Sequence, residues 1–143
     1  MRLTRYTDNA LRALTYLAMH DDRPSRIADI ARRMGMSEDH TAKVVAKLAE
    51  LGVVTTQRGR AGGVLLARPA ELINIGDVVR AVEDNLTLVE CFDPDENRCP
   101  IAPACALASV LDEALQAFFA VLHARTLADL VAKPKSLTRL LIA

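Results

Sequence analysis

The sequence contains no tryptophan and only five aromatic residues, although 51% of its 143 residues are hydrophobic. Its core must therefore be built from Leu, Ala, Val and Ile side chains, which suits closely packed helices. The chain also lacks a run of about 18 apolar residues, so we expect no membrane span and no membrane partner. Its start has neither a continuous apolar stretch nor a cleavage site, which argues against a signal peptide.

Cysteine is also scarce, and its three copies are Cys91, Cys99 and Cys105. Three thiols cannot all pair as disulfides, and without a secretory leader we expect a cytoplasmic protein with reduced thiols. Clustered thiols in that setting are more often metal or redox ligands than structural bridges. Their spacing of seven and five residues differs from the closer pairs of most zinc and iron–sulfur sites, so zinc, iron–sulfur or three unrelated thiols stay open.

The net charge is zero, because 18 basic residues balance 18 acidic ones, but the charged residues are unevenly distributed. Residues 1–68 carry twelve basic and seven acidic side chains, whereas residues 69–143 carry six basic and eleven acidic ones. A basic front half indicates that this half faces a polyanion such as nucleic acid. A chance distribution of solvated charges is the alternative.

The spacing of apolar residues predicts three helices in the front half. The first runs from a Thr7 cap to His20, the second follows a Ser25 cap and ends at Gly35, and the third runs from Ser37 to about residue 51. Two runs rich in β-branched and aliphatic residues then flank a glycine-rich turn, which predicts a β-hairpin. The pattern is typical of a winged helix-turn-helix in a mainly α-helical fold with one small hairpin.

The back half predicts a short helix over residues 75–83 with an Asn74 cap, then an irregular cysteine segment with three prolines. A long apolar helix without proline or glycine follows from about Ala104 to Val131. The expected regions are a DNA-binding part over residues 1–70, a connecting helix and cysteine loop over residues 71–103, and a dimerisation helix with a tail over residues 104–143.

The second helix of a helix-turn-helix pair normally enters the major groove, because a helix fits the width of that groove. Hydroxyl and imidazole groups early in it can bond base edges or phosphates, and its lysines can neutralise phosphates. Glu38 and Asp39 either serve the helix N-terminus or read cytosine amino groups. Arginines at the hairpin tip suit the minor groove, and glycines let the backbone approach the duplex. The candidate DNA contacts are Ser37, His40, Thr41, Lys43, Lys47, Arg58, Arg60 and Gly62.

Four segments resemble the Rrf-type winged-helix transcriptional regulators, a family that includes the NsrR, IscR and RirA groups. They are MRLTRYTDNALRAL, RIADIARRMGMSEDHTAKVVAKL, RGRAGG and ECFDPDENRCPIAPAC. The resemblance extends from residue 1 to about residue 131 and is greatest to the NsrR group. It implies a homodimer held by the long C-terminal helix and an iron–sulfur cluster on the three cysteines. The cluster would govern binding to palindromic double-stranded operator DNA.

The three cysteines are one ligand short of a four-ligand site, and the resemblance also indicates which residue could supply the fourth ligand. IscR-type regulators carry a histidine two residues after the third cysteine, where this chain has Leu107. NsrR-type regulators use an aspartate near the N-terminus of the partner subunit, and Asp8 matches that position. Arg12 lies one turn further on and can orient this carboxylate, although Asp8 could also simply favour the helix dipole. The implied ligands of a [4Fe–4S] cluster, or alternatively a [2Fe–2S] cluster, are Cys91, Cys99, Cys105 and Asp8.

We therefore expect a repressor that senses nitric oxide through its cluster and then releases its operator. An iron-responsive repressor of the RirA type, whose members share the cysteine spacing but usually lack the aspartate, is the alternative. A zinc-stabilised DNA-binding protein without a sensing role also stays open. We do not expect an enzyme with a cysteine nucleophile, because no histidine lies near the cysteine loop in the sequence.

Overall fold

The computed structural model describes residues 2–59, 62–132, 137 and 139. Its two strands form an antiparallel hairpin in which Val54 lies opposite Leu66 and Gln57 opposite Gly63. The remaining elements are helical, so the expected mainly α-helical fold with a small hairpin is confirmed. The elements in chain order are α1 (Arg5–Ala18), α2 (Ile27–Met34), α3 (Glu38–Glu50), β1 (Val54–Gln57), β2 (Gly63–Leu66), the short 3-10 helix η1 (Ala70–Leu72), α4 (Ile75–Val82), η2 (Glu90–Phe92), η3 (Ala102–Ala104), α5 (Ala106–His123) and α6 (Leu127–Leu130).

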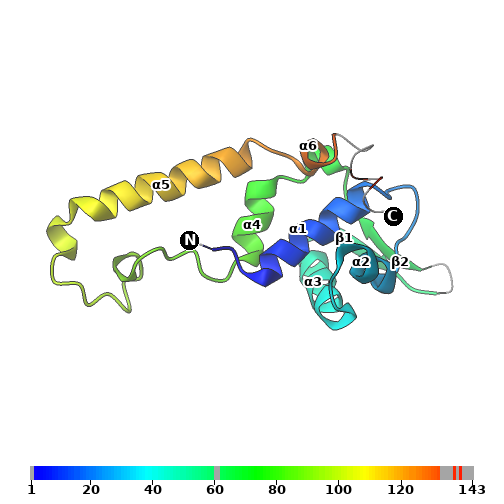
Figure 1. Ribbon diagram of the computed structural model, residues 1–143, viewed down its shortest axis with the longest axis horizontal. Coiled ribbons are helices and arrows are strands. Elements are labelled where there is room, and N and C mark those ends of the chain that lie inside the picture. The colour runs from blue at the N-terminus through cyan, green and yellow to red at the C-terminus, as the bar shows by residue number, and fades with distance from the viewer. Residues whose placement is uncertain (1, 60–61, 133–136, 138, 140–143) are drawn as a thin grey trace.

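The molecule consists of a winged-helix body and a long arm formed by α5 (Figure 1). In the body, α1 packs against α2, α3, α4 and the hairpin. The core is aliphatic, as the composition predicts, with Leu14, Ile30 and Leu48 fully buried. Phe119, near the end of α5, is the buried residue that this helix contributes. Most of α5 therefore lies outside the core of the body.

Local capping explains several of the predicted helix boundaries. Ser37 caps α3 by accepting a hydrogen bond of 3.3 Å from the backbone N–H of His40. Asn74 caps α4 in the same way, through a bond of 3.2 Å from the N–H of Asp77. Gly35 ends α2 with a φ of 64°, a left-handed conformation that favours glycine. These three predictions are confirmed.

Two other predicted caps are wrong. The first helix begins earlier than expected, because Thr4 rather than Thr7 is its N-cap and accepts a bond of 3.2 Å from the N–H of Thr7. Ser25 does not cap α2, because its backbone is paired with Val64 through N–H···O bonds of 2.9 and 2.8 Å. This bridge joins the segment before α2 to the hairpin, and the N-cap of α2 is Arg26, without a side-chain bond.

The long C-terminal helix ends at His123 and not at Val131 as the sequence predicts. The side chain of Asn74 donates a hydrogen bond of 2.7 Å to the carbonyl of His123. Beyond it, the N–H of Leu127 donates to the carbonyl of Ile73 at 2.8 Å. Bonds to the segment before α4 therefore replace the bonds that would continue α5, and a separate short helix, α6, follows.

The 18 residues of α5 have a mean hydropathy of 1.3, with the length and composition of a membrane-crossing helix. Asp112 and Glu113 interrupt α5, so it is not a continuous run of apolar residues, and the absence of a membrane span stays a prediction. Only 6% of this helix is buried in the single chain. Leu107, Val110 and Val121 are 61%, 59% and 65% exposed, so they present an apolar surface that one chain leaves uncovered.

Glu83, directly after α4, is a buried carboxylate with 7% exposure. It accepts bonds of 2.6 Å from the Thr7 hydroxyl, 3.1 Å from the Thr4 hydroxyl and 2.9 Å from the Thr4 N–H. Burial alone would raise the pKa of Glu83, but these bonds to the charged form outweigh it and hold the pKa below its ordinary value of 4.5. The carboxylate thus ties the start of α1 to the end of α4.

We expect Glu83→Gln to lower the free energy of unfolding by about 1.5–3 kcal/mol, the range for hydrogen bonds to charged groups. Because the folded-state pKa is depressed, the wild-type contribution is complete above the unfolded-state value and disappears as the pH falls through the folded-state value. Urea unfolding between about pH 7 and about pH 3 should therefore show a loss of stability below pH 4.5 that Glu83→Gln lacks. The exposed Glu71→Gln is the control, and parallel curves for Glu83→Gln and wild type would contradict the assignment.

Candidate DNA interface and cysteine loop

The candidate recognition surface is the exposed side of α3. Ser37 and His40 are exposed at its start, and the Ser37 Oγ lies 2.8 Å from the His40 Nδ1. Lys43 is exposed one turn later. Lys47 is half-exposed and lies 3.8 Å from the carboxylate of Glu50. Four of the predicted side chains thus lie on one accessible helix, with donor groups and positive charge available.

Thr41 lies on the other side of α3, so its prediction as an accessible DNA contact is wrong. Its side chain is fully buried, and its hydroxyl donates a bond of 2.8 Å to the carbonyl of Ser37. Val44, Val45 and Leu48 share this buried face. The sequence contained the signal, because Thr41 precedes these apolar residues at the helical spacing of three, four and seven.

The tip of the hairpin carries an exposed Arg58, whereas Arg60 lies outside the described residues. Gly62 donates its N–H to the carbonyl of Gly59 at 3.0 Å. A Cβ on Gly62 would lie 2.9 Å from the carbonyl carbon of Arg58, closer than van der Waals contact allows. The tight turn itself therefore requires glycine at this position, whatever the turn binds.

The first helix contacts the turn between α2 and α3 through a chain of polar side chains. Asp8 and Arg12 form an ion pair of 2.9 Å, which confirms the predicted contact one helical turn apart. The same guanidinium donates a bond of 3.4 Å to the carbonyl of Met34, the last residue of α2. The Arg12 side chain thus links the Asp8 carboxylate to the turn that leads into α3.

A second contact from α1 reaches the middle of α3. The Tyr6 hydroxyl donates a bond of 3.1 Å to the carbonyl of Lys43. Burial, together with the negative charges of Asp84 and Glu50, raises the pKa of Tyr6 above its ordinary value of 10.0. The phenol therefore stays protonated as a donor, and α1 contacts both the end of α2, through Arg12, and the recognition helix, through Tyr6.

A cleft of ≈ 520 Å³ lies between α1 and the start of α3. It places the Asp8 carboxylate and two candidate DNA contacts around one open space. Its lining residues are Arg5, Asp8, Asn9, Arg12, Gly35, Met36, Ser37 and His40.

The cysteines lie in the irregular segment between α4 and α5, which is free of α-helix as the prolines predict. Cys91 is in η2, Cys105 directly precedes α5, and Cys99 lies between them. All three are half-exposed free thiols. The described residues contain no group of three His, Cys, Asp or Glu side chains placed to hold a metal ion, so the single chain does not gather these thiols.

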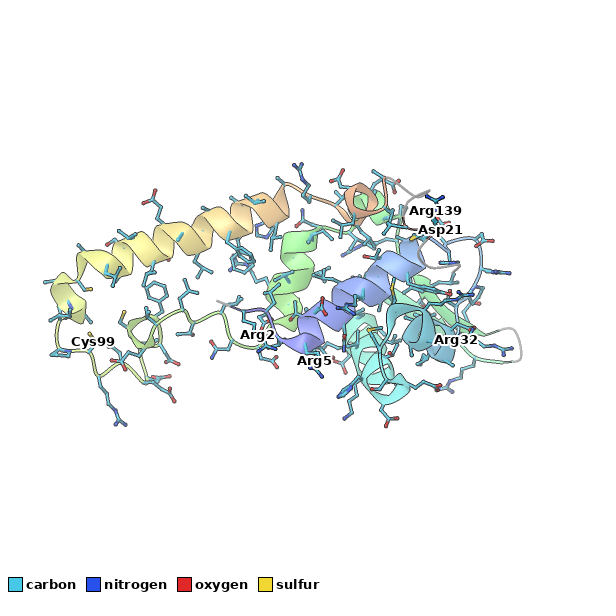
Figure 2. The ribbon with its side chains drawn as sticks, in the orientation of Figure 1. Arg2, Arg5, Asp21, Arg32, Cys99 and Arg139 are labelled. Carbon is cyan, nitrogen blue, oxygen red and sulfur yellow. The ribbon has the colours of Figure 1, made fainter. Side chains whose placement is uncertain are left out.

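The Asp8 carboxylate lies on a different part of the molecule from the thiols. Figure 2 shows Cys99 at the far end of the arm, whereas Arg5, in the first turn of α1, lies on the body. Three soft thiols and one harder carboxylate fit an iron–sulfur cluster in donor type. Within one chain, however, α1 and the cysteine loop are apart, so the described part of a single chain does not bring this donor set together.

Comparison with known proteins identifies the family. The Rrf2 family, described as iron-dependent transcriptional regulators, matches residues 3–133. The HTH-type transcriptional regulator NsrR of Bacillus subtilis is 48% identical over 144 residues, covering 99% of this chain and 97% of its own. NsrR of Geobacillus kaustophilus is 50% identical over 143 residues, with the same coverage. Protein aau3 of Rhizobium meliloti is 46% identical over 136 residues, covering 94% and 88%.

Solved structures agree with this assignment. T. potens IscR has a TM-score of 0.76 at 27% identity, covering 94% of this chain and 88% of its own. CymR, the global cysteine regulator of B. subtilis, has a TM-score of 0.76 at 26% identity, covering 92% and 97%. The winged-helix prediction is confirmed, and the NsrR and CymR relatives are named as regulators rather than as enzymes. The chain belongs to the Rrf2 family of transcriptional regulators.

Proposed function

We propose that this protein is a homodimeric, iron–sulfur-dependent repressor that releases its operator DNA in response to nitric oxide. The observation that carries the proposal is the position of Asp8, which shares a cleft with the start of α3 and is linked by Arg12 to the turn before it. The family's description as iron-dependent supports the cofactor. The resemblance to NsrR-type regulators supports the signal.

The candidate cluster ligands are Cys91, Cys99 and Cys105 of one subunit and Asp8 of the partner subunit. A [4Fe–4S] cluster suits this donor set, and a [2Fe–2S] cluster is the alternative. When bound, the cluster would supply an iron that a diatomic ligand can reach at its harder, weaker carboxylate ligand. The contribution of the chain itself is to present that carboxylate on α1.

Dimerisation through α5 would bring the separated donors together. The exposed Leu107, Val110 and Val121 form an apolar surface of the kind that marks an association site. A two-fold dimer uses the same surface of both chains, so each arm covers the other. In such a dimer the cysteine loop at the end of one arm lies beside the body of the other subunit, which carries Asp8.

Asp8 would transmit the state of the cofactor to the recognition helix. As an ion pair with Arg12, its carboxylate helps to hold a guanidinium that also bonds the Met34 carbonyl. A carboxylate engaged by the cofactor leaves Arg12 free to change its contact with the turn. Because this turn leads directly to Ser37, the two states of Asp8 bias the position of α3, as expected of a local switch with a global effect.

DNA binding is assigned to α3 and the hairpin of each subunit. The proposed contacts are the exposed Ser37, His40, Lys43 and Arg58, with Lys47 and the backbone at Gly62. A dimer of winged helices suits two half-sites about one helical turn apart, about 34–36 Å, on one side of the duplex. The palindromic operator follows from this two-fold symmetry.

An iron-responsive repressor of the RirA type is the second candidate. The family's description as iron-dependent favours it, and it has the same cysteine loop and architecture. The presence of Asp8, which RirA-type regulators usually lack, favours the response to nitric oxide. The two candidates differ in whether nitric oxide or the loss of iron ends DNA binding.

The central test is anaerobic purification followed by absorption spectra before and after stoichiometric nitric oxide. We expect a brown protein with a visible band that collapses, and operator affinity that is lost in parallel with the band. An iron chelator added instead of nitric oxide tests the second candidate. A colourless protein that contains one zinc ion per subunit would contradict both.

Asp8→Ala tests the carboxylate ligand. We expect the cluster lifetime in air to fall at least about tenfold, the lower range for changes around bound metals, with an altered visible spectrum. The loop residue Asp22, which is also exposed, provides the matched control Asp22→Ala. If both variants keep the spectrum and lifetime of the wild type, Asp8 is not a ligand.

Lys43→Ala tests the recognition helix. We expect a lower affinity for all operator sequences alike and a salt dependence whose slope decreases by about one, because one phosphate contact is lost. Fluorescence anisotropy at several salt concentrations measures both quantities. Arg125→Ala, which removes an exposed cation outside the DNA-binding region, is the control. A slope equal to that of the wild type would exclude a phosphate contact by Lys43.

A further inference from the structure

The end of α5 meets the start of α4 in a joint where side chain and backbone are in very close contact. Gly76, the second residue of α4, is buried beneath the ring of His123. A Cβ at Gly76 would lie 2.6 Å from Cγ and 2.7 Å from Nε2 of that ring. Any larger residue at this position must therefore displace the ring, the helix, or both.

The ring of His123 is held by its surroundings. Its Nε2 lies 3.3 Å from the Oδ1 of Asp77, and its carbonyl accepts the 2.7 Å bond from Asn74. Its ring also lies against Phe119, with the ring centroids 6.0 Å apart. The guanidinium of Arg80 lies 4.1 Å from the centre of Phe119, a cation–π contact from α4 to α5. Displacing His123 would therefore disturb contacts made by both helices.

Backbone bonds on the far side of the joint fix the chain that leaves α5. The N–H of Ile75 donates to the carbonyl of Arg125 at 3.0 Å, and the N–H of Leu127 donates to that of Ile73 at 2.8 Å. The side chain of Leu127 is fully buried. The last turns of α5 are thus anchored to α4, while the rest of the helix extends from the body as an arm (Figure 1).

The length of this arm amplifies any change at the joint. At 1.5 Å per residue, the 18 residues of α5 span about 27 Å. A tilt of about 10° would move the far end of the helix by about 5 Å relative to the body. This displacement exceeds the spacing of about 3.4 Å between successive base pairs of DNA. A small change at the joint therefore matters on the scale of operator geometry.

We propose that Gly76 and His123 are positioning residues that set the half-site spacing accepted by the dimer. The inference rests on the proposed function, in which two chains associate through α5. The recognition helix belongs to the body and the dimer contact to the arm, so the angle between body and arm fixes the separation of the two α3 helices. The joint specifies distance along the DNA and not base sequence, because it lies outside the proposed DNA contacts.

The test uses the anaerobically purified dimer and an operator selected from random duplexes with the wild-type protein. A panel of duplexes then varies the spacer between the half-sites one base pair at a time, and an isolated half-site measures the intrinsic affinity of the body. For Gly76→Ala we expect the preferred spacer to shift by at least one base pair. Affinity for the original spacer should fall about tenfold with unchanged half-site affinity, a change comparable to the cost of deforming the site.

Steric rescue separates this role from a general loss of stability. The double variant Gly76→Ala/His123→Ala removes the ring that the new methyl group would meet. Its preferred spacer should therefore return toward that of the wild type, with the broader preference expected from the loss of His123. Ala81→Gly weakens α4 on its exposed side and should keep the wild-type spacer. If Gly76→Ala does not form a folded dimer, His123→Ala alone should broaden the spacer preference, because it removes the contacts with Asp77 and Phe119.

Failure of the inference and failure of the proposed function give different results. An unchanged preferred spacer in Gly76→Ala together with an unbroadened preference in His123→Ala, each with equal loss of affinity at every spacer, would overturn the positioning role and leave the repressor proposal intact. A wild-type protein that prefers no spacer, or that is monomeric by sedimentation, would overturn the dimeric operator-binding proposal and the spacing inference together.

Discussion

The hydrogen bonds between the buried carboxylate of Glu83 and the two threonines at the start of α1 fix the helix that links the two candidate functional regions. A buried carboxylate is costly unless it is hydrogen-bonded, and bonds to a charged group are short and directional. The three bonds from Thr4 and Thr7 therefore specify where α1 begins. From that position, α1 presents Asp8 to the cleft and reaches the recognition helix through Tyr6.

Helix α1 makes a strong buried contact with Glu83 and a weak exposed ion pair between Asp8 and Arg12. This difference in strength suits the proposed switch. The anchor at Glu83 is 7% exposed, whereas the side chains of Asp8 and Arg12 are 52% and 48% exposed. Exposed ion pairs contribute only about 0–1 kcal/mol, so the carboxylate can exchange Arg12 for another partner at little cost. The helix stays in place while one of its side chains changes partner. In the proposed mechanism, that combination would let a change at Asp8 reach the recognition helix without unfolding the body.

Features set by neighbouring residues were predictable from the sequence, and features set by distant ones were not. The caps at Ser37 and Asn74 depend on residues three positions away, so the pattern alone identified them. The end of α5 depends on Asn74, which is 49 residues from His123, and no proline or glycine marks it. The burial of Glu83 likewise depends on threonines more than 70 residues away. The donor residues of the candidate cluster could be named from their motif, but their separation in one chain required the fold.

In the proposed dimer, a second chain would cover the apolar surface of the arm and would bring the thiols of one subunit to Asp8 of the other. The arm has an uncovered apolar surface at Leu107, Val110 and Val121 and ends in thiols without a fourth ligand. Asp8 belongs to α1, whose first turn lies on the body, apart from Cys99 (Figure 2). A single two-fold association would cover the surface, complete the donor set and pair the recognition helices. Because one interface would serve all three purposes, the angle at which the arm leaves the body constrains cofactor and DNA geometry together. The close packing of His123 on Gly76 is then a functional constraint as well as a structural one.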